Sequence, residues 1–552
     1  MGVWLMNNYN FELTDIKSIS DTFPQKRDCL ENLQDYLCKE STTKICILYG
    51  LRRTGKTVLL KQALLSLGEK EREKSAFITC NRNTDFYDVL NFIKENIDNG
   101  KRYFCIDEIT YAKNFQNLAE ILSDNFVSNY NARIILTGTD SLGLSLPSHS
   151  NLYDRAEFVH TTYMSFSEFS RIMNNDSIDF YIKHGNTLSE MNPFEDYNSA
   201  NEYIETSIVS NMISSLQKSE GIRSYPPALT ELYKNEELEN AIQRIINQYS
   251  QTITMRALRK QFELSPFENG VNALTKRDKD NLDLKSKFYG ERITENAKRA
   301  LKIDNFNTPV SQQHLDDIKD FLKEMDVILT IPVFTSYKNG NKDVDMEIIT
   351  HPGMYHANLL YTIDELRKDD NWLPNATKGQ KEGLLKAVYE CSAGKILENF
   401  VIADIFKMLG STKSSSYEDT TRWYVSKFSH TVQGVFEEAD LIIHDRQQKD
   451  VFLFEIKHSS EIHESQTKHL ESKSFIEYIE NNFDTVKEKV VLYTGKNNSQ
   501  LNIKRLNVSD FLKHMYEHCQ KENYSVENTI QALSKSRKNI TITNENDYEP
   551  ER

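Results

Sequence analysis

The stretch KICILYGLRRTGKTVLLKQALLSL, residues 44–67, decides the fold. Its first part, residues 44–49, is a short apolar run rich in β-formers, which predicts a buried strand. The loop GLRRTGKT, residues 50–57, follows directly, and residues 58–67 then have helical spacing. A strand, a GxxxxGKT loop and a helix in this order predict a P-loop, in which backbone N–H groups and the helix N-terminus face phosphates.

The residue types of this loop predict that it binds ATP with Mg²⁺. Lys56 is expected to reach the β- and γ-phosphates and to act in catalysis, and the Thr57 hydroxyl is expected to ligate Mg²⁺. The nucleotide-binding residues predicted from the loop and from a later strand end are Gly50, Arg52, Arg53, Thr54, Gly55, Lys56, Thr57, Val58 and Thr139.

A second predicted strand carries an acidic pair at its end. Residues 102–106 (RYFCI) are mostly apolar and run directly into Asp107 and Glu108. Asp107 is expected to hold Mg²⁺, and Glu108 is expected to orient or deprotonate the attacking water. This pair predicts hydrolysis of ATP. The alternative is a nucleotide-binding remnant in which Glu108 orients some other group.

A third predicted strand, residues 133–136 (RIIL), ends in a polar stretch. Polar groups at this position can sense the γ-phosphate and position the water. We expect Thr137 or Thr139 to do so.

The composition indicates a soluble chain of several domains. At 552 residues the chain is too long for one core, and its 39% hydrophobic and 27% charged residues are ordinary. Its seven cysteines include no CxxC pair, which favours reduced thiols over a disulfide framework. No run approaches the roughly 18 apolar residues that a membrane span needs. We therefore expect a cytoplasmic protein with no membrane contact.

The motifs at residues 50–57, 106–108 (IDE) and 136–139 (LTGT) resemble those of a prokaryotic family of AAA-type P-loop ATPases. Members of that family carry a C-terminal domain of unknown function with a restriction-endonuclease-like fold. The resemblance touches most of residues 40–512, and it is strong at the P-loop and at the C-terminal block. It therefore implies an ATPase core followed by an endonuclease-like domain.

The next block of that family reads Gly-Arg, then a strand, then a Pro-Leu-Ser-Phe-x-Glu-like stretch. In this chain Asp154 replaces the glycine, and Tyr163 and Met164 replace Pro-Leu. Arg155 could act as a phosphate-sensing or finger arginine. It could equally be a surface arginine or one that pairs with Glu157.

The C-terminal part carries a second group of polar residues. Residues 394–409 have helical spacing and include Glu398, and residues 438–443 and 451–457 read as the two strands of a hairpin. The predicted hairpin could bring Asp440 and Glu455 close together. Glu455 and Lys457 are two residues apart and so share a face of their strand.

A helical Glu followed by Asp-x14-Glu-x-Lys is the arrangement of restriction-endonuclease-like phosphodiesterases. In such a site carboxylates bind one or two Mg²⁺ beside the scissile phosphate, and the lysine activates water and offsets negative charge. The predicted metal ligands of the whole chain are Thr57, Asp107, Glu398, Asp440 and Glu455. The predicted catalytic residues are Lys56, Glu108, Glu455 and Lys457.

A basic stretch between residues 256 and 302 contrasts with the net charge of −14 for the whole chain. Residues 252–262 could form a short helix, and a helix and wing near 315–335 would complete a winged helix-turn-helix. On this interpretation phosphates of nucleic acid would contact Arg256, Arg259, Lys260, Lys276 and Arg277. The alternative is a solvated charged face on an interaction domain.

These patterns together predict a multidomain α/β protein. We expect a P-loop NTPase (AAA-like) parallel sheet core, a helical lid, a winged helix-like middle domain and a C-terminal restriction-endonuclease-like α/β domain. The expected boundaries are 1–20 for an N-terminal extension, 21–162 for the core, 163–250 for the lid, 251–375 for the winged helix-like domain, 376–515 for the endonuclease-like domain and 516–552 for a polar tail.

The predicted function is an ATP-binding and ATP-hydrolysing protein that controls a nucleic-acid-binding, nuclease-like C-terminal domain. The alternatives are a regulatory or signalling ATPase with a catalytically inactive platform, and a DNA-binding switch with slow turnover. The expected partner is ATP, with DNA, a protein partner or a second copy of the chain left open.

Overall fold

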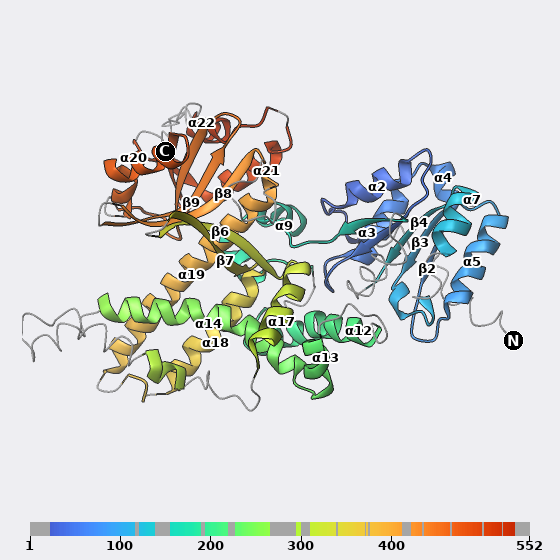
Figure 1. Ribbon diagram of the computed structural model, residues 1–552, viewed down its shortest axis with the longest axis horizontal. Coiled ribbons are helices and arrows are strands. Elements are labelled where there is room, and N and C mark those ends of the chain that lie inside the picture. The colour runs from blue at the N-terminus through green and yellow to red at the C-terminus, as the bar shows by residue number, and fades with distance from the viewer. Residues whose placement is uncertain are drawn as a thin grey trace, which may run out of the picture. The chain divides into compact units, whose positions relative to one another are not determined.

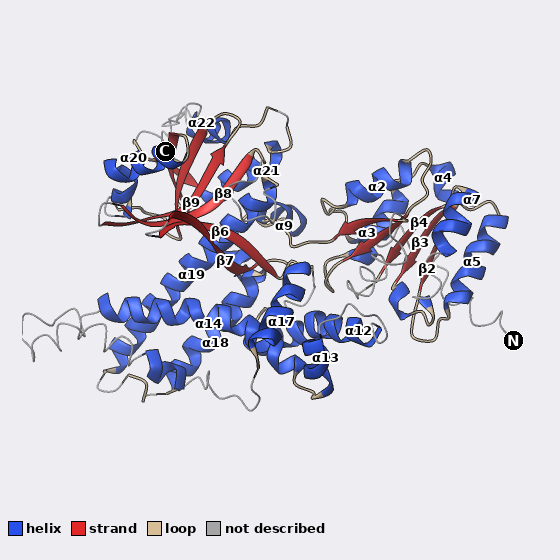
Figure 2. Ribbon diagram, in the orientation of Figure 1, coloured by secondary structure: helices blue, strands red, loops and turns tan. Residues whose placement is uncertain are grey.

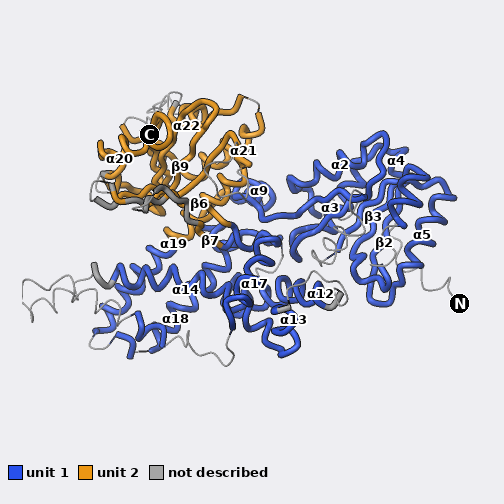
Figure 3. The backbone as a smooth tube through the Cα atoms, in the orientation of Figure 1, with its two compact units in different colours: residues 1–175, 179–329, 349–392 blue, residues 176–178, 330–348, 393–552 orange. Residues whose placement is uncertain are grey.

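The computed structural model describes residues 22–115, 121–138, 155–188, 194–218, 227–264, 294–299, 310–337, 340–369, 371–373, 376–410, 421–432, 435–463, 466–498, 502–521 and 523–535. The chain divides into two compact units (Figure 3). Unit 1 comprises Met1–Asn175, Asp179–Leu329 and Ile349–Ser392, and unit 2 comprises Asp176–Ile178, Thr330–Ile348 and Ala393–Arg552. Within the described ranges no helix has both the length and the apolar character that a membrane crossing requires.

A five-stranded sheet lies at the centre of the N-terminal part of unit 1 (Figure 2). Its strand order is β2-β3-β4-β1-β5, and every neighbouring pair is parallel. The strands are β1 (Ile45–Tyr49), β2 (Ser75–Thr79), β3 (Tyr103–Asp107), β4 (Arg133–Thr137) and β5 (Ala156–His160). The predicted parallel α/β core is therefore confirmed.

Both faces of this sheet are covered, as a parallel sheet requires. Ile45 and Ile47 of β1 belong to a core that includes residues of helix α5, whereas Cys46 and Leu48 belong to a core on the opposite face with residues of α2 and α3. The alternation of side chains along a strand explains this division. The helices that follow or precede the strands are α2 (Leu30–Cys38), α3 (Lys56–Leu65), α4 (Glu69–Glu73), α5 (Phe86–Asp98), η1 (Ile109–Tyr111), η2 (Leu122–Val127) and α7 (Ser128–Tyr130).

The rest of unit 1 is mainly helical (Figure 1). The predicted short helix at residues 252–262 is instead part of α14, a continuous helix of 27 residues that buries Met255 and Leu258. The expected boundary at 250/251 therefore falls inside a helix. The helices of this region are α9 (Phe166–Met173), α10 (Ile178–His184), α11 (Tyr197–Tyr203), η3 (Ile204–Val209), α12 (Ser210–Lys218), α13 (Pro227–Lys234), α14 (Leu238–Leu264), α17 (Gln312–Glu324) and α18 (Pro352–Lys368).

The predicted winged helix-like domain does not form a unit of its own. Helix α17 is followed by two strands, β6 (Ile328–Tyr337) and β7 (Gly340–Ile349), as a wing would require. These strands instead extend the sheet of unit 2, because β6 pairs in parallel with β8 (Trp423–Val432) through Val333 and Phe334. The two strands joined the unit 2 sheet because β6 pairs with a segment about 90 residues further along the chain. Local sequence does not reveal such pairing.

Unit 2 contains a seven-stranded mixed sheet in the order β12-β11-β10-β9-β8-β6-β7. The expected hairpin is present, because β9 and β10 are antiparallel and Asp445 pairs with Asp450. Helix α19 begins at Lys378, well before the predicted start at 394. The further elements are α19 (Lys378–Met408), β8 (Trp423–Val432), β9 (Val435–Asp445), β10 (Asp450–Lys457), η6 (Lys468–Glu471), α20 (Lys473–Asn482), β11 (Thr485–Tyr493), β12 (Lys504–Asn507), α21 (Val508–His518) and α22 (Val526–Lys535).

The core of unit 2 lies between this sheet and helix α20. It includes Phe428 of β8, Leu453 of β10, Val491 of β11 and Phe475 of α20. Burial of these large side chains fixes the positions of strands β8, β9 and β10. Asp440, in the middle of β9, and Glu455, near the end of β10, therefore lie on strands whose positions are fixed.

Candidate functional site

The loop between β1 and α3 has the backbone of a phosphate-binding loop. Gly50 and Gly55 have φ angles of +142° and +89°, which glycine adopts readily. A Cβ atom on Gly50 would lie 2.1 Å from Oγ1 of Thr161, so a side chain has no space there. Arg53 also has a positive φ, of 64°. The loop therefore depends on glycine at the two positions that the motif specifies.

The Lys56 side chain is buried inside this loop, with 7% of its surface exposed. Its Nζ atom donates hydrogen bonds to the backbone oxygens of Gly50, at 2.9 Å, and Leu51, at 2.8 Å. Burial lowers the pKa of Lys56 to about 8, although Glu108 and Asp107 act to raise it. A neighbouring anion would raise this pKa again, and a nucleotide phosphate supplies such an anion.

Three oxygen-bearing side chains meet beside Lys56. The Thr57 hydroxyl donates to Oδ2 of Asp107 at 2.8 Å, and the Thr137 hydroxyl donates to Oδ1 at 2.5 Å. Asp107 is buried at the end of β3. A hydroxyl in contact with a carboxylate, next to a lysine, is a donor set that suits Mg²⁺ bound together with a nucleotide. The predicted magnesium ligands Thr57 and Asp107 are therefore brought together, and they fit the group.

Glu108 lies directly after Asp107 in a constrained backbone. Its φ of +55° is uncommon for a residue with a side chain, and its N–H donates to Oγ1 of Thr137 at 3.3 Å. The turn of the chain at this residue begins η1 at Ile109. Strained backbone at a site of this kind is compatible with a positioned catalytic side chain.

The other residues predicted from the loop lie close to it. Arg52 donates to the hydroxyl of Tyr111 at 2.9 Å, and the Arg53 guanidinium lies 5.8 Å from the ring centroid of Tyr203. Thr54 donates to the backbone oxygen of Leu51 at 2.8 Å. Val58 lies in the first turn of α3. Thr139 lies outside the described residues, so of the two threonines expected at the end of β4 only Thr137 is described, and it contacts Asp107.

Sequence reasoning missed a buried arginine behind the P-loop. Arg27 donates to the backbone oxygen of Thr54 at 2.9 Å and to that of Thr162 at 3.0 Å. Its Nε atom pairs with Glu168 at 2.6 Å, and both side chains are buried. Glu168 is the glutamate of the predicted Ser-Phe-x-Glu block. The block therefore anchors an arginine that holds the loop, and no local signal marks Arg27.

Arg155 lies at the far end of the sheet from the P-loop. Its backbone oxygen accepts from Ile45 at the start of β1, and the P-loop follows the other end of that strand. Its guanidinium pairs with Asp124 at 2.9 Å, whereas Glu157 pairs with Lys39. Of the alternatives considered for Arg155, a pair with Glu157 is therefore not the one that forms, and the partner is Asp124. From this position Arg155 does not reach the nucleotide site of its own chain.

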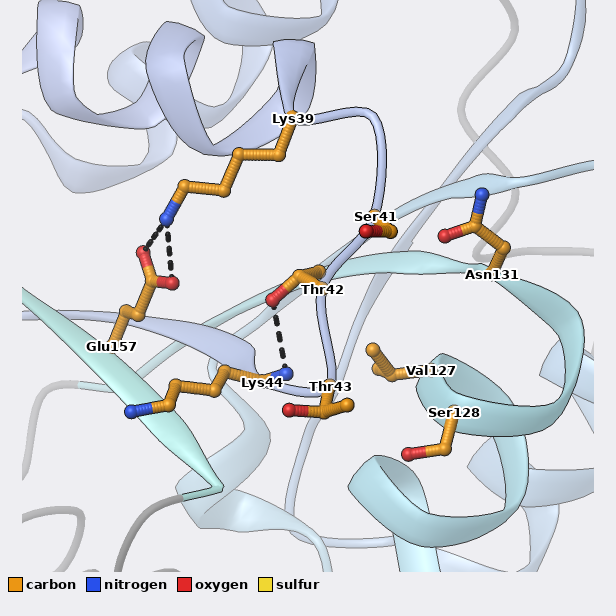
Figure 4. Close-up of a pocket in the computed structure, with 9 residues that line it drawn as sticks. All are labelled: Lys39, Ser41, Thr42, Thr43, Lys44, Val127, Ser128, Asn131 and Glu157. Carbon is orange, nitrogen blue, oxygen red and sulfur yellow. Dashed lines mark hydrogen bonds and ion pairs between the residues drawn. The ribbon is translucent and has the colours of Figure 1, made fainter.

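An open pocket of about 590 Å³ lies at the same far end (Figure 4). Its lining includes Thr42, Thr43 and Lys44, which directly precede β1, together with Asn131. Glu157 and Lys39 form an ion pair at one side of the pocket. This pocket is separate from the P-loop, because three of its lining residues directly precede β1, whereas the P-loop follows β1.

In unit 2 the hairpin brings the predicted polar residues together. Phe454 of β10 pairs with Leu441 of β9. Asp440 and Glu455 are the next residues beyond this pair, and they therefore lie close together. Oδ2 of Asp440 accepts from the N–H of Ile456 at 2.9 Å and lies 3.5 Å from Nζ of Lys457. Lys457 also contacts Glu455 directly.

Burial, like charges and opposite charges act in different directions on the groups at this hairpin end. Burial and the neighbouring Glu455 raise the pKa of Asp440. Burial alone would lower the pKa of Lys457, but the Asp440 and Glu455 carboxylates raise it overall. His469 lies 2.9 Å from the second Glu455 oxygen, a bond that raises the pKa of His469 despite its burial. Each carboxylate therefore already has a cationic or hydrogen-bonding neighbour.

A second lysine, Lys427, lies beside this group of Asp440, Glu455 and Lys457, which we call the C-terminal carboxylate cluster. It was not predicted from the sequence. Lys427 of β8 contacts Glu398 of α19, and its Nζ lies 3.3 Å from Glu438 and 4.0 Å from Asp440. Lys395 lies 2.5 Å from the same Glu398 oxygen. No local signal marks Lys427, because β8 also carries serine, histidine and threonine residues.

This cluster does not fit a divalent metal ion. The predicted ligands Glu398, Asp440 and Glu455 do converge, but Lys427 and Lys457 lie among their oxygens. In the part of the chain that the structure describes, no group of three or more His, Cys, Asp or Glu side chains is arranged to hold a metal. The expectation of a metal-loaded endonuclease site is therefore not met by the geometry.

Three of the five basic residues proposed to contact nucleic acid, Arg256, Arg259 and Lys260, lie on α14. Arg256 and Lys260 are exposed one turn apart, and Arg259 is half-buried. Lys276 and Arg277 lie outside the described residues. The described residues place the basic side chains along a long helix, and not on the recognition helix of a winged helix-turn-helix.

The fold and the site of unit 1 define a P-loop nucleotide-binding domain. Comparison with known families agrees, because residues 42–170 match the family described as "AAA domain". Residues 393–511 match the family described as "Domain of unknown function (DUF4143)". The chain therefore contains an AAA-type P-loop ATPase domain followed by this C-terminal domain. Neither match identifies the fold of the C-terminal domain.

Two individual proteins can be compared with the chain. An uncharacterized protein of Haemophilus influenzae is 29% identical over 154 residues, which are 26% of this chain and 38% of the relative. The chain thus spans well under two thirds of the length of this relative. Among solved structures, the S. cerevisiae Hsp104–ADP complex matches at 10% identity with a TM-score of 0.27, over 96% of this chain and 83% of that chain. That score is too low to carry an argument.

Proposed function

We propose that this protein is an ATPase whose nucleotide state controls a C-terminal binding platform. The observation that carries the proposal is the contact of Thr57 and Thr137 with the two oxygens of Asp107, beside the buried Lys56. Few arrangements other than a magnesium–nucleotide site need a hydroxyl, a carboxylate and a buried lysine at the end of parallel strands.

The residues of this site divide the work of phosphoryl transfer to water. Lys56 binds the phosphates, and Thr57 and Asp107 would hold Mg²⁺, which neutralises negative charge when bound. Glu108 orients and accepts a proton from the attacking water. Thr137 holds the Asp107 carboxylate in place and contacts the backbone of Glu108, so it connects the two acidic residues.

A chain of contacts leads away from the P-loop within unit 1. The hydroxyl of Thr54 lies 2.8 Å from that of Thr161, and the hydroxyl of the next residue, Thr162, donates to Asp326 at 2.5 Å. The backbone oxygen of Asp326 accepts from Thr350 at 2.6 Å. Asp326 directly precedes Val327 and strand β6. These contacts support a role for the loop in setting the position of the segment that leads into β6.

The proposal is tested with Glu108→Gln in the full chain. ATP should bind to the variant as tightly as to the intact protein, while phosphate release falls by about 10²–10³-fold because the water loses its base. Glu95→Gln, on the exposed part of α5, is the matched control and should change neither quantity. Hydrolysis at the normal rate by Glu108→Gln, or the absence of ATP binding to the intact chain, would refute the proposal.

A nucleic-acid-cleaving C-terminal domain remains the second candidate, because Asp440, Glu455 and Lys457 do meet at the hairpin end. A cleavage assay with DNA and RNA, Mg²⁺ or Mn²⁺, and ATP separates the two. We expect no cleavage. Cleavage that Asp440→Ala and Lys457→Ala both abolish would establish the nuclease and reject the platform.

A further inference from the structure

We propose that the ammonium group of Lys427 is the resident cation of the C-terminal carboxylate cluster and takes the position of a divalent metal. The domain would then keep its carboxylates together without any metal. The proposal concerns unit 2 alone and does not depend on the nucleotide site.

The position of Lys427 is the first observation. Its side chain is 6% exposed, and its Nζ atom contacts Glu398 while lying 3.3 Å from Glu438 and 4.0 Å from Asp440. These carboxylates come from α19 and β9, which are separate elements. A single buried cation therefore faces three carboxylates from two directions, which is the position that a shared metal would need.

The sheet is irregular at this point. Ser426 of β8 pairs with Ile442 of β9, but Phe428 pairs with Ala439. Two residues of β9, Asp440 and Leu441, therefore lie opposite the single residue Lys427. Such a bulge changes the direction of a side chain and is a built feature of a fold. Here it brings the Asp440 carboxylate beside the Lys427 ammonium group.

The charges are nearly balanced without a metal. The four carboxylates of the cluster are those of Glu398, Glu438, Asp440 and Glu455, and the three lysines are Lys395, Lys427 and Lys457. Their formal charges sum to −1, and protonation of His469 beside Glu455 brings the total to zero. A divalent cation would make the cluster net positive while displacing or repelling Lys427. Burial of an excess charge is costly, so the lysines and a metal are alternative occupants.

The test counts Mn²⁺ bound to the full chain, without nucleotide, from the electron paramagnetic resonance signal of the free ion. Every protein carries Thr57→Ala, which removes a ligand of the nucleotide-linked site. With Lys427 intact we expect no bound Mn²⁺. Lys427→Met, which keeps the length of the side chain and removes its charge, should bind one Mn²⁺ per chain. Adding Asp440→Asn to that variant should abolish the binding.

Lys395→Met is the matched control, since Lys395 shares the same Glu398 oxygen but lies nearer the surface. It should bind no Mn²⁺, because Lys427 remains in place. The proposal is overturned if the protein with Lys427 binds one Mn²⁺ that Asp440→Asn removes. It is also overturned if folded Lys427→Met binds none. Should Lys427→Met fail to fold, the comparison of intact Lys427 with Asp440→Asn still decides between a metal and a resident lysine.

Discussion

Two buried lysines show how differently this chain uses the same side chain. Lys56 in the P-loop hydrogen-bonds to two backbone carbonyls, and burial lowers its pKa to about 8. Lys427 in unit 2 is buried to the same degree, but the Glu398 and Asp440 carboxylates outweigh that burial and raise its pKa. The first site is built to gain an anion, whereas the second already contains its counter-charges.

The largest effect expected at the P-loop comes from Lys56→Ala. The variant loses the cation that binds the phosphates, so turnover should fall by at least about 10²-fold. Phosphate release and nucleotide affinity measure the loss. Lys61→Met is the control, since Lys61 is a buried lysine of the same helix that lies over the ring of Phe77. Equal losses for both variants would mean that the effect is one of folding.

Removal of Lys427 should instead reduce stability. Lys427→Met removes the buried cation that faces Glu398, Glu438 and Asp440, although Lys395 still contacts Glu398. Breaking a buried pair costs up to about 3–5 kcal/mol of unfolding free energy. Lys395→Met, at a more exposed lysine of the same cluster, should cost about 1 kcal/mol or less. Denaturant unfolding of unit 2, followed beside ATP turnover, measures both. Similar costs for the two variants would contradict the central place given to Lys427.

The low pKa of Lys56 predicts how nucleotide binding depends on pH. In the free protein Lys56 loses its proton as the pH rises through about 8, whereas bound phosphate keeps the proton on. Nucleotide binding must then take up a proton, so affinity should fall by up to about tenfold per pH unit above that point. The groups facing Lys56 are Asp107, Glu108 and Arg52. Calorimetric titration with ADP measures the trend, and an affinity that is constant from pH 7 to 10 would contradict it.

The smallest change in unfolding free energy is expected from Thr162→Val, which alters the contact between the P-loop region and the segment before β6. Thr162→Val keeps the shape of the side chain and removes its hydrogen bond to Asp326, which should cost about 1 kcal/mol. His160 lies 3.2 Å from the same carboxylate and should keep part of the contact. Unfolding of unit 1 with and without ADP measures the cost. A cost that disappears when ADP is bound would show that the contact belongs to the nucleotide-free state only.

Much of the P-loop site could be predicted from the sequence because its signals are local. The apolar run before Gly50, the loop glycines and the acidic pair at Asp107 each depend on a few neighbouring residues. The contact between Thr57 and Asp107 spans 50 residues, yet parallel strands bring their ends to the same edge of the sheet. Sequence pattern therefore specified both the elements and their meeting point.

The C-terminal cluster could be predicted only in part. Alternation along β10 placed Glu455 and Lys457 on one face, and the hairpin brought Asp440 near them. Lys427 was missed because it enters the cluster through the bulge between β8 and β9. The pairing of β6 with β8 was missed for a similar reason, since no local pattern distinguishes a wing from an added strand.

The difference between the two lysines is tested most directly by the number of Mn²⁺ ions bound per chain at saturating ADP. The account predicts one Mn²⁺, which binds with the nucleotide and is lost in Thr57→Ala. The Asp107 carboxylate contacts the hydroxyls of Thr57 and Thr137, whereas the C-terminal carboxylates already contact lysines. Two Mn²⁺ per chain, the second of them lost in Asp440→Asn, would contradict it.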